Sequence, residues 1–210
     1  MESTVPTHPE PSALTALISN TSAPSNPYSA TTLQILHNLE HQHLWTSLQV
    51  HNLEVPSADS ESPSLSHFLI SGIPPHRVYT HPDEQLYMLE KGLRDEDVDL
   101  ERMFVLPTAQ GQSWSLRRMA AVFDSLADPA EEFCSLSSSA GNDAEDRGTK
   151  ANSEKAAKLA EYYERRTKAF RTREWGGKRI LLAMVDKGMG GDGTVVYYIV
   201  QEGAVKPRQN

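Results

Sequence analysis

Two histidines early in the chain have the spacing of metal ligands. The stretch His37-Asn38-Leu39-Glu40-His41 matches the H-x-x-E-H signature of a class of zinc peptidases, in which two imidazoles lie one helical turn apart. Such an enzyme needs a further acidic ligand from a large catalytic domain, whereas we expect a short helix end, a strand and a loop after this motif. We therefore interpret the motif as polar helix surface and predict no metal site.

Other catalytic motifs are missing from the sequence. It contains no G-x-S-x-G nucleophile elbow, no G-x-x-x-x-G-K-[ST] phosphate loop and no G-x-G-x-x-G dinucleotide motif. All eight histidines precede Pro82, so the rest of the chain lacks the usual proton shuttle of neutral-pH catalysis. We therefore assign no catalytic residue, no cofactor and no small-molecule ligand.

Positive charge is concentrated in one segment. Residues 150–179 contain ten Lys or Arg against four Glu, so this segment carries +6 in a chain whose net charge is -8. A basic segment can contact phosphate groups even when the whole chain is acidic. The alternative is that these charges form the solvated face of a helix. The candidates for RNA contact are Arg165, Arg166, Lys168, Arg171 and Arg173.

The overall composition suits one soluble domain with tails. The chain has 210 residues, 38% of them hydrophobic. No apolar run approaches the roughly 18 residues that span a bilayer, and the first residues lack the basic and apolar regions of a secretory signal. The single cysteine, Cys134, excludes an internal disulfide and a cysteine-based zinc site. A cytosolic or nuclear compartment follows as the expectation.

The first third of the chain combines a tail, a helix and two strands. Residues 1–28 are rich in Ser, Thr, Pro and Asn, and this composition predicts a disordered tail. Apolar residues at helical spacing predict a helix over 31–48. Strands are predicted over 50–55 and 67–73, with a loop over 56–66 between them.

Helices and strands alternate in the middle of the chain. A helix is predicted over 82–93, a strand over 103–106, and then a helix capped by Ser113 or Ser115. The polar, acidic residues 128–153 predict a flexible insertion, and 155–175 a basic helix. This alternation is typical of an α/β or α+β domain.

The last forty residues predict a hairpin. Apolar runs at 179–186 and 194–201 are joined by a Gly-rich connection, as in two paired strands. The second run is apolar on both faces, so both faces of that strand must be covered. Helices of the same domain or a partner protein could provide the cover.

Five stretches together resemble a known family: HQHLWTSLQVH (41–51), YTHPDEQLYMLEKG (79–92), FVLPT (104–108), WSLRRMAAVFDSL (114–126) and TVVYYIVQEGAVKP (194–207). They resemble the small, non-catalytic subunit of the eukaryotic tRNA-splicing endonuclease, the "Sen-fifteen" type. The resemblance implies a single nuclease-like α/β domain over 29–207. Its mixed sheet, flanked by helices, would be similar to the C-terminal domain of that enzyme and to restriction-endonuclease-like sheets.

The resemblance also implies partners and a compartment. In the family this subunit pairs with the catalytic "Sen-thirty-four" type subunit inside a heterotetramer that excises introns from precursor tRNA. This implies a nuclear protein or, alternatively, one at the cytosolic face of the mitochondrial outer membrane. Catalytic members use a Tyr, His and Lys set whose histidine belongs to the C-terminal half, where this chain has none. The expectation is a structural subunit without catalytic residues.

Two partner-binding features are implied by the resemblance. A loop before the last strand carries acidic residues that enter a basic cleft of a neighbouring subunit, although Lys187 departs from this pattern and an ordinary hairpin turn is the alternative. The last strand would pair with its counterpart in the partner, or with a second copy in a homodimer of the isolated chain. The loop candidates are Asp186, Gly190, Gly191 and Asp192, and the strand candidates are Val195, Tyr197, Tyr198, Ile199 and Val200.

Two other functions stay open at this point. The chain could be a stand-alone RNA-binding module that uses the basic helix over 155–175, or an active RNA nuclease with an unrecognised site. The first should bind tRNA alone at moderate salt, and the second should cleave precursor tRNA alone.

Overall fold

The computed structural model describes residues 29–55, 65–126, 150–186, 194–202 and 204–207, together with Ser12 and Thr15. In chain order the elements are α2 (Ala30–His41), β1 (Thr46–Val55), β2 (Leu65–Ile73), α3 (Pro82–Lys91), the short 3-10 helix η1 (Asp95–Asp97), β3 (Met103–Ala109), α4 (Leu116–Ser125), α6 (Lys150–Thr172), β4 (Arg179–Val185), β5 (Val195–Gln201) and β6 (Ala204–Pro207). None of the described helices is long and apolar enough to cross a membrane.

The strands form one mixed sheet in the order β1-β2-β3-β4-β5-β6. Only β3 and β4 are parallel, and the chain between them passes through α4 and α6; the other neighbours are antiparallel. A parallel pair needs such a crossover, whereas antiparallel neighbours can be joined by short turns. The predicted α/β class, with a mixed sheet flanked by helices, is confirmed. The closer likeness to nuclease sheets stays a prediction.

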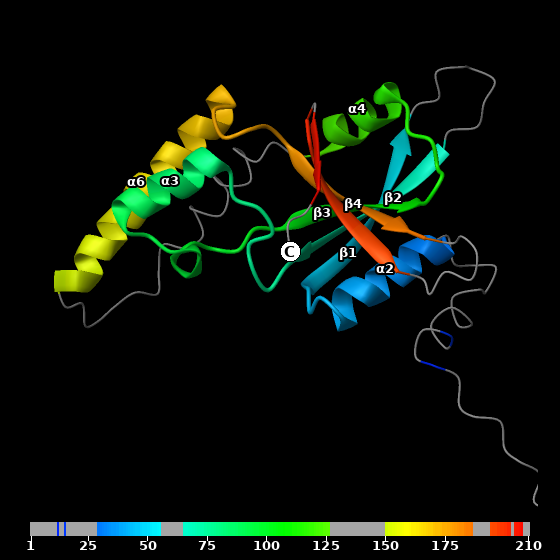
Figure 1. The fold of residues 1–210 in the computed structure, drawn as a ribbon, viewed down its shortest axis with the longest axis horizontal. Helices are drawn as coiled ribbons and strands as arrows, with labels where there is room; N and C mark the ends of the chain where they lie inside the picture. Colours follow the sequence, from blue (N-terminus) through cyan, green and yellow to red (C-terminus); the bar gives the residue numbers. More distant parts are fainter. Residues whose placement is uncertain are drawn as a thin grey trace, which may run out of the picture.

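One helix covers each face of the sheet (Figure 1). On one face, Ile35 and Leu39 of α2 pack into a buried cluster with Val105 of β3 and Leu181 of β4. On the other face, α4 contributes to a second buried cluster, which includes Leu106 and Ile180 on the same two strands. Alternate residues of β3 and β4 therefore belong to different cores, as expected for a sheet covered on both sides.

The remaining helices form a separate unit. The helices α3 and α6 lie side by side at one end of the molecule, beyond the sheet (Figure 1). They share a third buried cluster with residues that flank η1 and follow α6; its members are Met88, Leu93, Val98, Tyr162, Ala169 and Trp175. We call α3, η1 and α6 together the helical wing.

The helix predicted over 31–48 ends earlier than expected, at His41. Leu44 has a left-handed backbone (φ 55°), and the Trp45 amide donates to the Leu39 carbonyl, so the chain reverses there. Leu48 lies on β1, yet it packs against the same core as α2. Apolar residues of the helix and of the next strand therefore share one core. Their combined positions in the sequence happen to have helical spacing, and so the predicted helix is too long.

Other predicted boundaries also shift. The strand β1 begins at Thr46 and β2 at Leu65, so the hairpin connection is shorter than the predicted loop. The basic helix begins at Lys150 and ends at Thr172, so the last four residues of the predicted insertion are helical. The predicted tail over 1–28 lies outside the described residues except Ser12 and Thr15, as do 56–64, 127–149 and 187–193.

The strand β3 is longer than predicted because it continues through Pro107. The β2 pairing stops at Val105, and only β4 pairs with the rest of β3. No residue of β2 pairs with Pro107, so on that side of the strand the missing N–H of proline costs no hydrogen bond. The helix α4 begins as predicted after Ser115, whose hydroxyl accepts a hydrogen bond from the Arg118 amide at 3.2 Å.

Candidate functional site

The predicted hairpin is present as β4 and β5. Leu182 lies opposite Tyr198, and Met184 opposite Val196, in the antiparallel register. Since side chains alternate along a strand, these four residues share the face of the sheet on which α4 lies. Val196 is 40% exposed, and the other three are half-buried. We call Leu182, Met184, Val196 and Tyr198 the β4–β5 apolar face.

Three of the predicted strand residues belong to the core of the domain itself. Tyr197 is buried beneath α2, and its hydroxyl donates to Oδ1 of Asn38 at 2.5 Å. Ile199 lies in the same core, and Val200 lies beneath α4 on the other face. These side chains follow the alternative interpretation of a strand covered by its own helices. Val195 packs partly against the α2 core, which leaves Tyr198 as the most available of the five.

The outer edge of β5 is covered along part of its length. The strand β6 pairs with Tyr198–Gln201 and not with the beginning of β5. Within the described chain, no strand lies beside the outer edge of Val195 and Val196. An open edge beside a half-exposed apolar face is a common site for the addition of a partner strand.

Sequence reasoning missed Leu182, Met184 and Val196. The run over 179–186 is predicted only as one strand of the hairpin, and Val196 is part of the apolar run over 194–201 without being singled out. Pairing the two strands in antiparallel register and alternating the faces would have grouped these residues with Tyr198. Which of the two faces is less well covered depends on the position of α4, and the strand sequences do not contain that information.

The predicted loop is described at one of its positions. Asp186 is half-buried at the end of β4, and its amide donates to the Thr194 carbonyl at 3.2 Å. With the Gln110 amide turned so that its nitrogen faces Asp186, the side chain donates to the Asp186 carboxylate. This carboxylate therefore also fixes the turn after β3. Gly190, Gly191 and Asp192 lie outside the described residues.

The predicted RNA-contact residues on α6 lie in different environments. Arg166 is 1% exposed, so its guanidinium cannot contact RNA at the surface. Arg165 is ion-paired with Glu174, and Arg173 lies 3.4 Å from Glu202. Lys168 and Arg171 are exposed near the C-terminal end of the helix, where positive charge also compensates the helix dipole.

Arg166 takes part in a buried charge cluster where the wing meets the sheet. Glu84 on α3 is fully buried, and its Oε1 accepts hydrogen bonds from Arg77 at 2.8 Å and from the Tyr162 hydroxyl at 2.5 Å. The Arg166 Nε lies 3.4 Å from the same oxygen, and its Nη2 is ion-paired with Glu101. These groups come from α3, α6 and the segments that connect the wing to β2 and β3.

A third arginine extends this cluster to the sheet. The guanidinium of Arg179, the first residue of β4, lies 5.3 Å from the centre of the Tyr79 ring and 5.6 Å from that of Phe170. Arg166 lies 5.2 Å from the Phe170 ring as well. Cation–π contacts of this kind are stronger when the cation is shielded from water. We call Arg77, Glu84, Glu101, Arg166 and Arg179 the junction cluster.

Burial and charge pairing shift the pKa values in the junction cluster in opposite senses. Burial alone would raise the pKa of Glu84, but the guanidiniums of Arg166 and Arg77 outweigh it and hold the pKa below its ordinary value of 4.5. Burial lowers the pKa of Arg166 to about 9 against the opposing effect of Glu84, so this guanidinium stays charged at neutral pH. Glu84 and Arg166 are therefore both charged at pH 7 and form an ion pair in the cluster.

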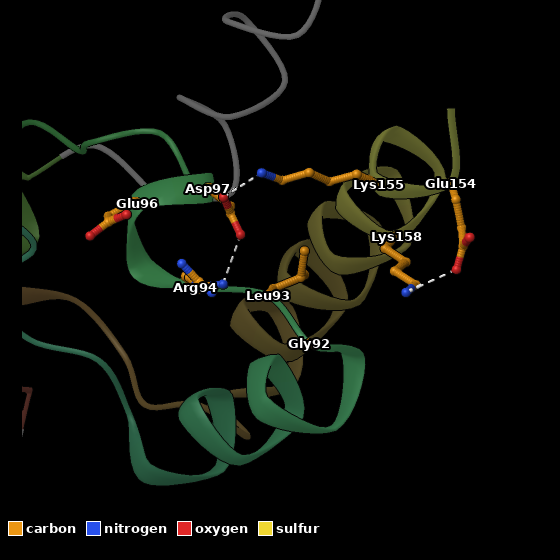
Figure 2. A pocket seen from close by; sticks show the side chains of 8 residues that line it. All are labelled: Gly92, Leu93, Arg94, Glu96, Asp97, Glu154, Lys155 and Lys158. Atoms are coloured by element: carbon orange, nitrogen blue, oxygen red, sulfur yellow. Dashed lines mark hydrogen bonds and ion pairs between the residues drawn. The ribbon is translucent and has the colours of Figure 1, made fainter. Parts of the chain in front are cut away.

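The wing also has an open hollow of about 540 Å³ between the end of α3, η1 and the first turns of α6 (Figure 2). Its charges are largely paired with each other. Lys155 lies 2.6 Å from Asp97, and Lys158 lies 3.1 Å from Glu154. A hollow with internally compensated charges offers little to a small charged ligand, so we assign no ligand to it.

The histidine motif on α2 is not assembled as a metal site. The rings of His37 and His41 are 4.4 Å apart in an edge-to-face arrangement, and the Asn38 side chain binds Tyr197. In the part of the chain that the structure describes, no group of three or more His, Cys, Asp or Glu residues could hold a metal ion. The motif instead supports the packing of α2 on β5.

Comparison with known proteins identifies relatives of the chain. The family model described as "Sen15 protein" matches residues 34–139 and 151–210. The "Probable tRNA-splicing endonuclease subunit tsp-1" of Neurospora crassa is 35% identical over 207 residues, which cover 92% of this chain and 71% of the relative. No solved structure matches the chain. Since the family model spans most of the sequence, including α2, α4 and the final hairpin, the chain belongs to the Sen15 protein family.

Proposed function

We propose that this chain is a non-catalytic, structural subunit of a tRNA-splicing endonuclease, the enzyme that excises introns from precursor tRNA. Membership of the Sen15 family and the printed description of the Neurospora relative support this function. The absence of histidine after Pro82 supports a role without catalysis. The observation that carries the proposal is the half-exposed β4–β5 apolar face beside the open start of β5.

The β4–β5 apolar face would bind a partner subunit, which we propose to be the catalytic "Sen-thirty-four" type. Covering Val196 and Tyr198 would remove apolar surface from water, and a strand added beside Val195 would satisfy its backbone groups. The loop residues Asp186, Gly190, Gly191 and Asp192 would then enter a basic cleft of a neighbouring subunit, where carboxylates contribute specificity and association rate. We place the complex in the nucleus or at the cytosolic face of the mitochondrial outer membrane.

A stand-alone RNA-binding module receives less support from the structure. Of the five candidate cations, Arg166 is buried, and Arg165 and Arg173 are ion-paired. Lys168 and Arg171 provide too few phosphate contacts for strong binding by the isolated chain. Contact of these two residues with precursor tRNA inside the complex remains compatible with the proposal, as does a homodimer of the isolated chain through β5.

Association with the catalytic subunit tests the proposal. We expect Tyr198→Asp and Val196→Asp to weaken co-purification of the two subunits at least about tenfold, because each places a charge in an apolar interface. The circular dichroism spectrum should stay native, since Val196 is 40% exposed and Tyr198 is half-buried. The matched control is Leu116→Asp on α4, where the side chain is 91% exposed. Undiminished co-purification of the β5 variants would contradict the placement of the interface.

A further inference from the structure

The helix α3 has two different sides. Glu84 and Met88 are buried against α6 and the junction cluster. Leu86 and Leu89 lie on the opposite side at a spacing of three residues, and they are 57% and 68% exposed. Exposed leucines occur singly on most proteins, but two neighbours on one helix face form a small apolar surface.

Acidic residues flank these leucines. Asp83 precedes Leu86 by three residues and Glu90 follows it by four, so the three lie along one stripe of the helix. Both carboxylates are exposed. Around them, residues 82–101 contain eight Asp or Glu against two Lys or Arg. One of the two, Lys91, lies 2.6 Å from Glu161 on α6.

The domain itself does not require apolar residues at these positions. Six large hydrophobic residues of the described chain are exposed, and two of them, Leu86 and Leu89, lie on α3. The junction cluster fixes the other side of α3 through Glu84, which binds Arg77 and Tyr162. The helix is therefore a pre-organised platform, which lowers the entropic cost of binding.

We propose that the outer surface of α3, formed by Asp83, Leu86, Leu89 and Glu90, binds a basic amphipathic helix of a partner protein. The leucines would pack against the apolar stripe of that helix, and the carboxylates would pair with Lys or Arg beside the stripe. Charge complementarity selects this partner, because an acidic surface repels RNA and anionic membranes. The surface lies on the wing, apart from the β4–β5 apolar face, so this inference does not depend on the proposed catalytic partner.

Fluorescence anisotropy with the full chain tests the inference. The probe is a labelled Leu/Lys peptide of about 18 residues, long enough to form a helix, with leucines at helical spacing. One control peptide has the same composition in scrambled order, and another has Glu in place of Lys. We expect the chain to bind the Leu/Lys helix at least about tenfold more tightly than either control, and the affinity to fall as salt rises.

Two variants distinguish specific binding at this surface from nonspecific binding of the peptide elsewhere on the protein. Leu86→Ser/Leu89→Ser, which removes the apolar contact without adding charge, should reduce binding of the Leu/Lys helix at least about tenfold, whereas Leu116→Ser, at an exposed leucine of α4, should leave it unchanged. All three substituted side chains are exposed, so native circular dichroism spectra are expected for both variants. Equal affinity for the helical and scrambled peptides, unchanged binding by the α3 variant, or no binding by the unmodified chain would overturn the inference.

Discussion

The Glu84 carboxylate is fully buried, accepts two hydrogen bonds at a single oxygen and lies beside two arginines. A carboxylate in this position is costly to desolvate, and its partners offset that cost only while they remain in place. In the sequence Glu84 looks like an ordinary acidic residue in the first turn of a helix, where its negative charge interacts favourably with the helix dipole. Its structural role depends on arginines that are distant in the sequence.

Substitution of Glu84 by Gln is expected to destabilise the protein. The amide keeps the shape of the side chain but leaves the buried side chains of Arg166 and Arg77 without their shared carboxylate. The loss should be about 3 kcal/mol in the free energy of unfolding, measured by urea denaturation. Glu90→Gln, at an exposed position of the same helix, should change it by less than about 0.5 kcal/mol. Equal effects of the two substitutions would show that the junction cluster contributes no net stability.

The depressed pKa of Glu84 predicts acid sensitivity. Its folded-state pKa lies below the ordinary value of 4.5, so the unfolded chain binds the proton more readily. The stabilisation by this carboxylate is therefore complete above pH 4.5 and is lost as the pH falls through the folded-state value. Below pH 4.5, the free energy of unfolding should decrease more steeply for the unmodified protein than for Glu84→Gln. Parallel pH profiles would contradict the assignment.

At the scale of secondary structure, the sequence predicted the type of most described elements but not all their boundaries. The predicted strands and the helices α3, α4 and α6 follow from periodicity and capping signals such as Ser115. The strand β6 was missed, although Gln201 pairs with Ala204 across a two-residue connection that is typical of a hairpin. Pattern reasoning fails where a short edge strand has too few residues to show alternation.

The separation of the wing from the sheet could not be predicted. Leu159, Tyr162 and Phe170 recur at helical spacing in the sequence, which indicates an inner face of the basic helix but not the element that covers it. In the structure Tyr162 belongs to the wing core with Met88 and Trp175. Periodicity identifies an apolar face of a helix, but it does not say which element covers that face.

This separation predicts unequal stability within the molecule. The wing has a smaller core than the sheet, and it meets β4 through the charged junction cluster. In native-state hydrogen exchange, we expect amides of α3 and α6 to open at a lower free energy than those of β3 and β4. Glu84→Gln should lower the protection of the wing amides first. Equal protection of wing and sheet would mean that they unfold as one cooperative unit.

At the scale of the whole molecule, the described chain presents three chemically distinct surfaces. The β4–β5 apolar face lies on the sheet, the outer surface of α3 is acidic and apolar, and the end of α6 carries Lys168 and Arg171. Each surface suits a different kind of partner, which is compatible with the proposed role as a subunit of a complex. The family could be predicted from similar stretches that are spread along the sequence. The three surfaces could not, because each depends on how the elements are arranged in three dimensions.

The most direct test of the proposed function is a precursor-tRNA cleavage assay on the reconstituted complex. The chain is co-expressed with the catalytic and remaining subunits and purified by size exclusion, with the isolated chain as control. We predict that the complex containing this chain cleaves precursor tRNA at the intron boundaries, that the complex with Tyr198→Asp fails to assemble, and that the isolated chain does not cleave. Cleavage by the isolated chain, or full activity of a complex that lacks it, would contradict the assignment as a non-catalytic structural subunit.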